Sequence, residues 1–148
     1  MGLLWFFRMK EYEFIEHTAD IGIRVYGKSL EDLFKNAANA LFDIILDYPS
    51  KQLKQKQITL GADTVEDLFV IWLNELISCF FADKFLPADY SIKIEDSSQR
   101  KQLRASLCGQ DFDPYENKIN TEVKAATYHN VKIEKSEKGY KVEVIFDV

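Results

Sequence analysis

The chain has 148 residues, and its 19 Lys and Arg residues against 24 Asp and Glu residues give a formal net charge of −5. Affinity for duplex nucleic acid comes largely from basic side chains that neutralise phosphates, so this charge argues against strong direct nucleic-acid binding. The composition, 47% hydrophobic and 29% charged, is typical of a folded protein, and the length suits one domain with a sizeable core.

The chain begins with an apolar stretch, Leu-Leu-Trp-Phe-Phe, at residues 3–7. Arg8 ends this stretch after five residues, which is too short for a signal-peptide core or a membrane span. Met9 is a second candidate start, so we expect residues 1–8 to be a short apolar extension of a single domain over residues 9–148. We therefore expect a cytoplasmic protein with no membrane association.

Two helices are predicted by their start signals and apolar spacing. The first begins after Ser29 and ends before Tyr48-Pro49-Ser50. The second begins after Thr64, continues to about Phe85, and is apolar on more than one face, which predicts a central position. Glu-Asp-Leu-Phe at residues 31–34 recurs at residues 66–69, an offset of 35 that is consistent with duplication of a strand-helix unit.

The other segments are rich in β-branched and aromatic residues and are predicted to be strands. They cover residues 12–16, 21–26, 53–60, 90–95, 101–108, 122–135 (bent or interrupted near His129) and 140–146. Turn residues at 96–98 and 136–139 predict two hairpins, and residues 110–121 form a polar loop. The expected fold class is α+β, with mostly antiparallel β-sheets and two helices packed against one side of them.

Several common functional motifs are absent from the sequence, including GxGxxG, the P-loop, GxSxG, HExxH and the EF-hand loop. Cys79 and Cys108 have neither zinc-site spacing nor a disulfide framework, and we expect both to be reduced and mostly buried. Nucleotide-binding, protease and zinc-protein interpretations therefore have no support from motifs.

Two acidic segments are candidates for a metal site. In His17-Thr18-Ala19-Asp20-Ile21-Gly22, Asp20 either bonds backbone N–H groups in a turn or, with His17 nearby, serves a cation or a partner. At the other end of the chain, Asp147 and the carboxylate of Val148 follow a strand directly. If these groups converged with Asp20, they would form an oxygen-rich site for Ca²⁺, Mg²⁺ or Mn²⁺. The alternative is a C-terminal edge strand that ends in a solvated Asp147.

Two further candidate residues lie in the segment Thr121-Glu122-Val123-Lys124-Ala125-Ala126-Thr127-Tyr128-His129. Lys124 is either a solvated edge charge, as is usual for lysine in a strand, or a cation that balances the carboxylates or contacts a partner. His129 is either a hydrogen-bonded structural residue or a ligand. The paired acids of the two helix starts are expected to favour the helix dipole, and we assign them no catalytic role.

Three motifs together resemble the archease family. They are His-Thr-Ala-Asp-Ile-Gly-Ile at residues 17–23, Val-Lys-Ala-Ala-Thr-Tyr-His at residues 123–129, and the ending Val-Ile-Phe-Asp-Val at residues 144–148. Leu73-Asn74-Glu75-Leu76 fits the pattern of the second helix as well. The match runs in order from about residue 9 to the last residue.

The resemblance implies a non-enzymatic activator of the RtcB-type RNA ligase in tRNA splicing and RNA repair. Such proteins promote transfer of GMP from GTP to the ligase histidine and restore that step between turnovers. Carried over by motif, the metal ligands fall on Asp20, Asp147 and Val148, with Ca²⁺ as the expected ion and Mn²⁺ or Mg²⁺ as alternatives. The functional lysine corresponds to Lys124, with His17 and His129 beside it in the motifs.

The sequence departs from the family pattern at two places, and two alternatives to ligase activation stay open. Asn117 stands where family members often have a histidine, and residues 1–8 have no counterpart. The alternatives are a chaperone-like modulator of a tRNA methyltransferase and, ranked lower, a metal-dependent hydrolase that uses Asp20 and Asp147. The hydrolase lacks a clear nucleophile or general base beyond His17.

Overall fold

The computed structural model describes residues 11–15 and 19–148. The expected extension at residues 1–8 and the candidate His17 therefore lie outside the described residues. Within the described part, two helices are α2 (Leu30–Ile45) and α3 (Val65–Phe81). The strands are β1 (Tyr12–Ile15), β2 (Ile21–Gly27), β3 (Lys54–Ala62), β4 (Phe85–Asp96), β5 (Lys101–Asp111), β6 (Ala125–Ala126), β7 (Glu134–Ser136) and β8 (Gly139–Asp147).

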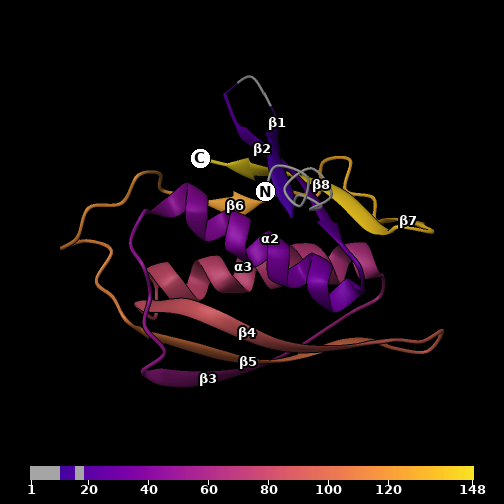
Figure 1. Ribbon diagram of the computed structural model, residues 1–148, viewed down its shortest axis with the longest axis horizontal. Helices are drawn as coiled ribbons and strands as arrows, with labels where there is room; N and C mark the ends of the chain where they lie inside the picture. The colour runs from indigo at the N-terminus through magenta and orange to yellow at the C-terminus, as the bar shows by residue number, and fades with distance from the viewer. Residues whose placement is uncertain (1–10, 16–18) are drawn as a thin grey trace, which may run out of the picture.

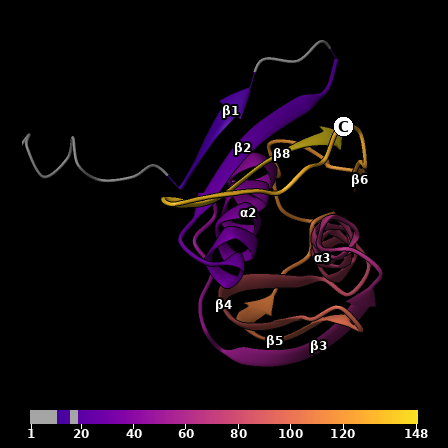
Figure 2. The same ribbon diagram turned by 90° about the vertical axis from the view of Figure 1, so that its right-hand side faces the viewer.

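Two antiparallel sheets enclose a layer formed by the two helices (Figures 1 and 2). The larger sheet has the order β1-β2-β8-β6, and β7 pairs with the other end of β8. The smaller sheet has the order β3-β5-β4. The predicted α+β class with antiparallel sheets is confirmed, but the helices contact both sheets and not one side alone.

Each helix begins at a capping residue that the sequence had indicated. The side-chain oxygens of Ser29 and Thr64 accept hydrogen bonds from the backbone N–H groups of Asp32 and Asp67, at 3.1 and 3.0 Å. These bonds satisfy amide donors that have no partner within the helix.

The caps are 35 residues apart, and the strand ends Gly27 and Ala62 are separated by the same number. The units β2-α2 and β3-α3 therefore match, although their strands belong to different sheets.

The acidic residue at the second position of each helix ties its unit to the opposite sheet. Glu31 Oε2 accepts a hydrogen bond from the backbone N–H of Ile94 in β4 at 3.2 Å. The equivalent Glu66 Oε2 accepts one from Ile133, immediately before β7, at 3.0 Å. The two glutamates therefore hold the layers together, in addition to any effect on the helix dipoles.

The core lies in the helix layer and on the facing sides of the sheets. Trp72 of α3 is fully buried and donates its indole N–H to the carbonyl of Phe34 in α2 at 3.0 Å. α3 buries side chains around most of its circumference: Leu68, Phe69, Val70, Trp72, Leu73, Leu76, Ile77, Cys79 and Phe80. This burial confirms the predicted central position, although α2 lies in the same layer.

The second helix is shorter than the sequence predicts. It ends at Phe81, and Lys84 has a left-handed backbone with φ of 57°, which redirects the chain into β4 at Phe85. Pro87 lies within β4 at a register shift, where its missing N–H is tolerated. Phe85 and Leu86 are therefore buried as the first residues of a strand, whereas the sequence had placed them at the end of the helix.

The predicted strand over residues 122–135 is also wrong in extent. Only Ala125–Ala126 and Glu134–Ser136 form strands, and they pair with opposite ends of β8. Between them the chain leaves the sheet, and Asn130 adopts a left-handed backbone with φ of 55°. The expected interruption near His129 is confirmed, and both predicted hairpin turns are present.

Neither described helix combines the length and apolar character needed to cross a lipid bilayer.

Both cysteines are free thiols, with Cys79 buried and Cys108 half-buried. Burial raises the pKa of the Cys79 thiol to about 11, so this side chain is a protonated, apolar part of the core at neutral pH.

Replacing Trp72 by phenylalanine tests the link between the two helices. Trp72→Phe removes the donor to the buried carbonyl of Phe34 and leaves a small cavity, so the free energy of unfolding should fall by about 2–3 kcal/mol. Urea unfolding followed by circular dichroism measures the change. Tyr115→Phe, at an exposed side chain, is the control and should change stability by less than about 0.5 kcal/mol. Equal losses in the two variants would contradict this account of the core.

Candidate functional site

The candidate metal ligands lie at one end of the larger sheet because of how β2 pairs with β8. The antiparallel ladder ends with Ile21 opposite Phe146. Asp20 and Asp147 are the next residues on the two strands, so they flank the same end of the ladder although they are far apart in sequence. The chain ends there at Val148, beside β6 (Figures 1 and 2). Asp20 and Val148 are partly exposed and Asp147 is exposed.

Lys124 reaches the same end of the sheet through its backbone. Its N–H donates to the carbonyl of Asp147 at 2.8 Å. The next residue, Ala125 of β6, pairs with Asp147 of β8. Its side chain is exposed to solvent. The structure thus brings Asp20, Asp147, Val148 and Lys124 together from the beginning, the late-middle part and the end of the chain.

The short strand β6, which directly follows Lys124, is held by one helical side chain. Asn74 of α3 accepts a hydrogen bond from the N–H of Ala126 at 2.8 Å and donates to its carbonyl at 3.2 Å. Thr127 adds a backbone bond and a hydroxyl bond to the carbonyl of Ile145, at 2.9 and 3.0 Å. The sequence pointed to Asn74 only as part of the Leu-Asn-Glu-Leu pattern at residues 73–76, but a polar residue in a buried helix was a signal for this anchoring contact.

His129 lies close to this end but outside the carboxylate group. With Gly22 and Ile145 it lines a small pocket of about 220 Å³, also bordered by Ile15, Asn130, Glu143 and Val144. Its Nε2 is 3.2 Å from Nδ2 of the exposed Asn130. His129 is therefore exposed at the edge of this pocket. The other candidate histidine, His17, lies outside the described residues.

Asn117 is occupied within its own loop. Its side-chain amide donates to the carbonyl of Asp113 at 2.9 Å, and its backbone N–H donates to the same oxygen at 3.1 Å. The residue that replaces a frequent family histidine thus closes a local turn.

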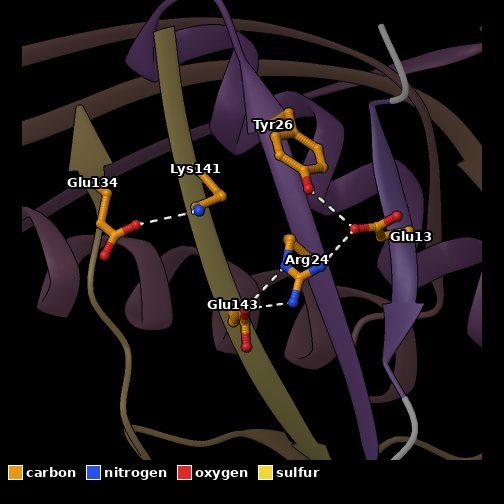
Figure 3. Close-up of polar contacts among 6 residues, drawn as sticks. All are labelled: Glu13, Arg24, Tyr26, Glu134, Lys141 and Glu143. Carbon is orange, nitrogen blue, oxygen red and sulfur yellow. Dashed lines mark hydrogen bonds and ion pairs between the residues drawn. The ribbon is translucent and has the colours of Figure 1, made fainter. Parts of the chain in front are cut away.

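The outer face of the larger sheet is covered by charged side chains. Arg24 of β2 contacts Glu13 of β1 at 2.7 Å and Glu143 of β8 at 2.9 Å, and Tyr26 donates to the same Glu13 oxygen at 3.0 Å. Figure 3 shows these residues in a row with the Lys141–Glu134 pair, which spans β8 and β7 at 3.4 Å. The hydrogen bonds that Arg24 donates to Glu13 and Glu143 raise the pKa of its guanidinium above the ordinary value, so Arg24 remains charged.

The chemistry of the donors determines which cation this end of the sheet suits. In residues 11–15 and 19–148, no three His, Cys, Asp or Glu side chains form a group that could hold a metal ion. The candidate donors at this end are the carboxylates of Asp20 and Asp147 and the α-carboxylate of Val148. An all-oxygen anionic set fits a hard cation, with backbone carbonyls or water completing the shell, and does not suit a soft metal.

Comparison with known proteins gives a consistent result over almost the whole chain. The profile described as "Archease protein family (MTH1598/TM1083)" matches residues 12–148. Protein archease of Pyrococcus abyssi is 39% identical over 132 residues, which cover 88% of this chain and 93% of the relative. Protein archease of Methanosarcina mazei is 33% identical over 141 residues, which cover 94% and 97%. The solution structure of Methanobacterium thermoautotrophicum protein 1598 matches with a TM-score of 0.80 at 28% identity, covering 95% of this chain and 100% of that one.

Asn74 and Asn39, which stands 35 residues earlier at the matching position of α2, test how the candidate site is anchored. Asn74→Ala removes both hydrogen bonds to Ala126, so the free energy of unfolding should fall by about 1–3 kcal/mol, and amide exchange at residues 124–127 should accelerate. Asn39, the equivalent residue of α2, makes no side-chain hydrogen bond to another described residue. Asn39→Ala should therefore leave exchange at residues 124–127 unchanged, and a similar acceleration in both variants would refute the anchoring contact. Hydrogen exchange by mass spectrometry and urea unfolding supply the measurements.

Proposed function

This chain belongs to the archease family, and on that premise we propose that it is an activator of an RtcB-type RNA ligase. In this proposal the chain promotes transfer of GMP from GTP to the ligase histidine and catalyses no reaction of its own. The observation that supports it is the meeting of Asp20, Lys124 and the acidic chain end at one exposed end of the larger sheet.

The proposed role of the site is to offer charge to a partner. Asp147 and Lys124 are joined through their backbones at 2.8 Å, so an anionic and a cationic residue belong to the same end of the sheet. Asn74 and the β2–β8 ladder hold that end in place. Such preorganisation of the backbone lets a docking surface engage a partner without first ordering the segments that carry the charged residues.

A divalent cation completes the proposed site. Asp20, Asp147 and the α-carboxylate of Val148 would hold it, with Ca²⁺ as the preferred ion and Mn²⁺ or Mg²⁺ as alternatives. When bound, the cation would supply positive charge that can neutralise phosphate oxygens. Lys124 is exposed beside these ligands, where its ammonium group can contact a GTP phosphate or an acidic group of the ligase.

Charge favours docking of this end on a ligase cleft that binds RNA. The chain has a net charge of −5, and a cleft that holds RNA is expected to be cationic. Complementary potentials accelerate encounter and orient the partners, and they weaken as ionic strength rises. The resulting contact would be transient, which suits an activator that acts again between turnovers of the ligase.

Ligase guanylylation tests the proposed activity. With GTP and limiting Mn²⁺, Asp20→Ala, Lys124→Ala and Asp147→Asn should each reduce stimulation of the cognate ligase at least tenfold, because each removes a charge from the docking end. Asp63→Ala, at an exposed acid outside this end, is the matched control and should stimulate fully. Transfer of labelled GMP to the ligase is the readout. Full stimulation by all three site variants, or turnover of a phosphoester by the isolated chain, would defeat the proposal.

Metal binding is tested without the ligase. Isothermal titration calorimetry with CaCl₂ should detect a site in the wild type, and Asp20→Asn or Asp147→Asn should weaken the affinity at least tenfold by removing an anionic ligand. Asp63→Asn removes the same charge elsewhere and should bind as the wild type does. Unchanged affinity in the Asp20 and Asp147 variants would show that the cation is not held at the chain end.

A further inference from the structure

The outer face of the larger sheet carries a small apolar hollow beside the candidate metal ligands. The pairing of β1, β2 and β8 places Ile15, Gly22 and Ile145 in one row across three neighbouring strands. These three residues line the pocket of about 220 Å³ that has His129 at its edge. We call the hollow formed by Ile15, Gly22 and Ile145 the Gly22 notch.

The two isoleucines of the notch lie on the solvent side of the sheet. Successive residues of a strand point to opposite faces, and the neighbouring Ile23 and Val144 are fully buried in the core. Ile15 and Ile145 are partly exposed and therefore belong to the outer face. The charged side chains around Arg24 on the same face are paired with one another. The notch is thus an apolar spot in a polar surface.

Gly22 forms the notch because it has no side chain to fill the space between the two isoleucines. A Cβ at this position would lie 3.4 Å from Cβ of Ile15 and 3.5 Å from the carbonyl oxygen of Ile15, which are ordinary van der Waals distances. The φ of Gly22 is outside the left-handed region, so the backbone does not require a glycine here. A glycine inside a strand often marks a place where another group approaches closely. Gly22 therefore suits a role in admitting a group from outside the fold.

The polar groups around the notch are already engaged. Nε2 of His129 is 3.2 Å from Nδ2 of Asn130, and Glu143 is paired with Arg24 at 2.9 Å. What the notch offers to an incoming group is therefore its apolar floor. An apolar floor inside a polar rim is the arrangement found at the centre of protein–protein contacts. These features favour an apolar side chain over a metal ion or a phosphate as the occupant.

The notch is continuous with the end of the sheet that carries the candidate ligands. Asp147 follows Ile145 by two residues on β8, so both side chains point to the outer face, with their Cα atoms about 7 Å apart. On the paired strand, Gly22 follows Asp20 by two residues. A partner that contacts Asp147 from this side therefore also covers the notch.

We propose that the Gly22 notch receives an apolar side chain of the RtcB-type ligase. This inference rests on the proposed function and adds to it a contact that contributes affinity without charge. A side chain seated in a desolvated pocket commonly carries a large share of the binding energy of an interface. The notch anchors the ligase in this way, while the charged residues at the chain end act on the guanylylation step.

Filling the notch tests the proposal. Gly22→Ala adds a methyl group where the ligase side chain would sit, and Ile145→Thr removes apolar surface from the floor. Biolayer interferometry with the immobilised cognate ligase should show an affinity about tenfold weaker for each variant. The loss should be the same at roughly 50 and 300 mM salt because no charge is removed, whereas the loss caused by Lys124→Ala should shrink at the higher salt. The added methyl group meets only ordinary contacts, so thermal unfolding of Gly22→Ala should be unchanged or slightly improved.

Two control variants make the same changes elsewhere. Gly61→Ala adds a methyl group to β3 of the smaller sheet, where a Cβ would lie 3.7 Å from the carbonyl oxygen of Lys101. Leu53→Thr removes an aliphatic side chain that is exposed outside the notch. Both controls should bind the ligase within about twofold of the wild type.

Three results would overturn the inference. Wild-type affinity in Gly22→Ala and Ile145→Thr would show that the ligase does not use the notch. If Asp20→Ala still abolished stimulation in that case, the proposed function would stand without the notch. A loss in Gly22→Ala that disappeared at the higher salt would show that the contact is not apolar. Binding of GTP to the isolated chain, measured by calorimetry and lost in Gly22→Ala, would assign the notch to a nucleotide and not to a ligase side chain.

Discussion

The antiparallel pairing of β2 with β8 is the constraint on which the arrangement of functional residues depends. Its register places Ile21 opposite Phe146, and this alone brings Asp20 to the end of the chain. A slip of one residue would exchange the inward and outward faces of β8 and expose the buried Val142, Val144 and Phe146. The apolar core therefore enforces the register, and the register positions the carboxylates.

β8 also organises the rest of the larger sheet. One edge pairs with β2 along its length, and the other pairs with β6 near the C-terminus and with β7 at the start of the strand. Its outward side chains separate two chemically different ends, an acidic one at Asp147 and a lysine-lined one at the β7–β8 hairpin. Between them the charged row around Arg24 keeps this uncovered face polar (Figure 3).

Local signals predicted most of the elements, and the errors have identifiable causes. The caps at Ser29 and Thr64 predicted both helix starts because a capping bond involves only neighbouring residues. The end of α3 was missed because the apolar residues Phe85 and Leu86 suit a buried helix as well as a buried strand. The left-handed backbone of Lys84, which separates the two elements, leaves no mark in the pattern of apolar residues. The strand over residues 122–135 was overextended because β-propensity does not reveal where β8 offers a pairing edge.

The sequence by itself determined the fold class, the helix starts, the duplication and the family motifs, since each is encoded in short-range spacing or in residue identity. Only the tertiary structure decided that Asp20, Lys124 and Asp147 share one end of a sheet, and that four lysines line a pocket at the other. The two hydrogen bonds between Asn74 and Ala126 were likewise decided only by the tertiary structure. The physical reason is that these groupings follow from strand register and helix packing between distant segments, which are selected by burial of the whole core and leave no local pattern.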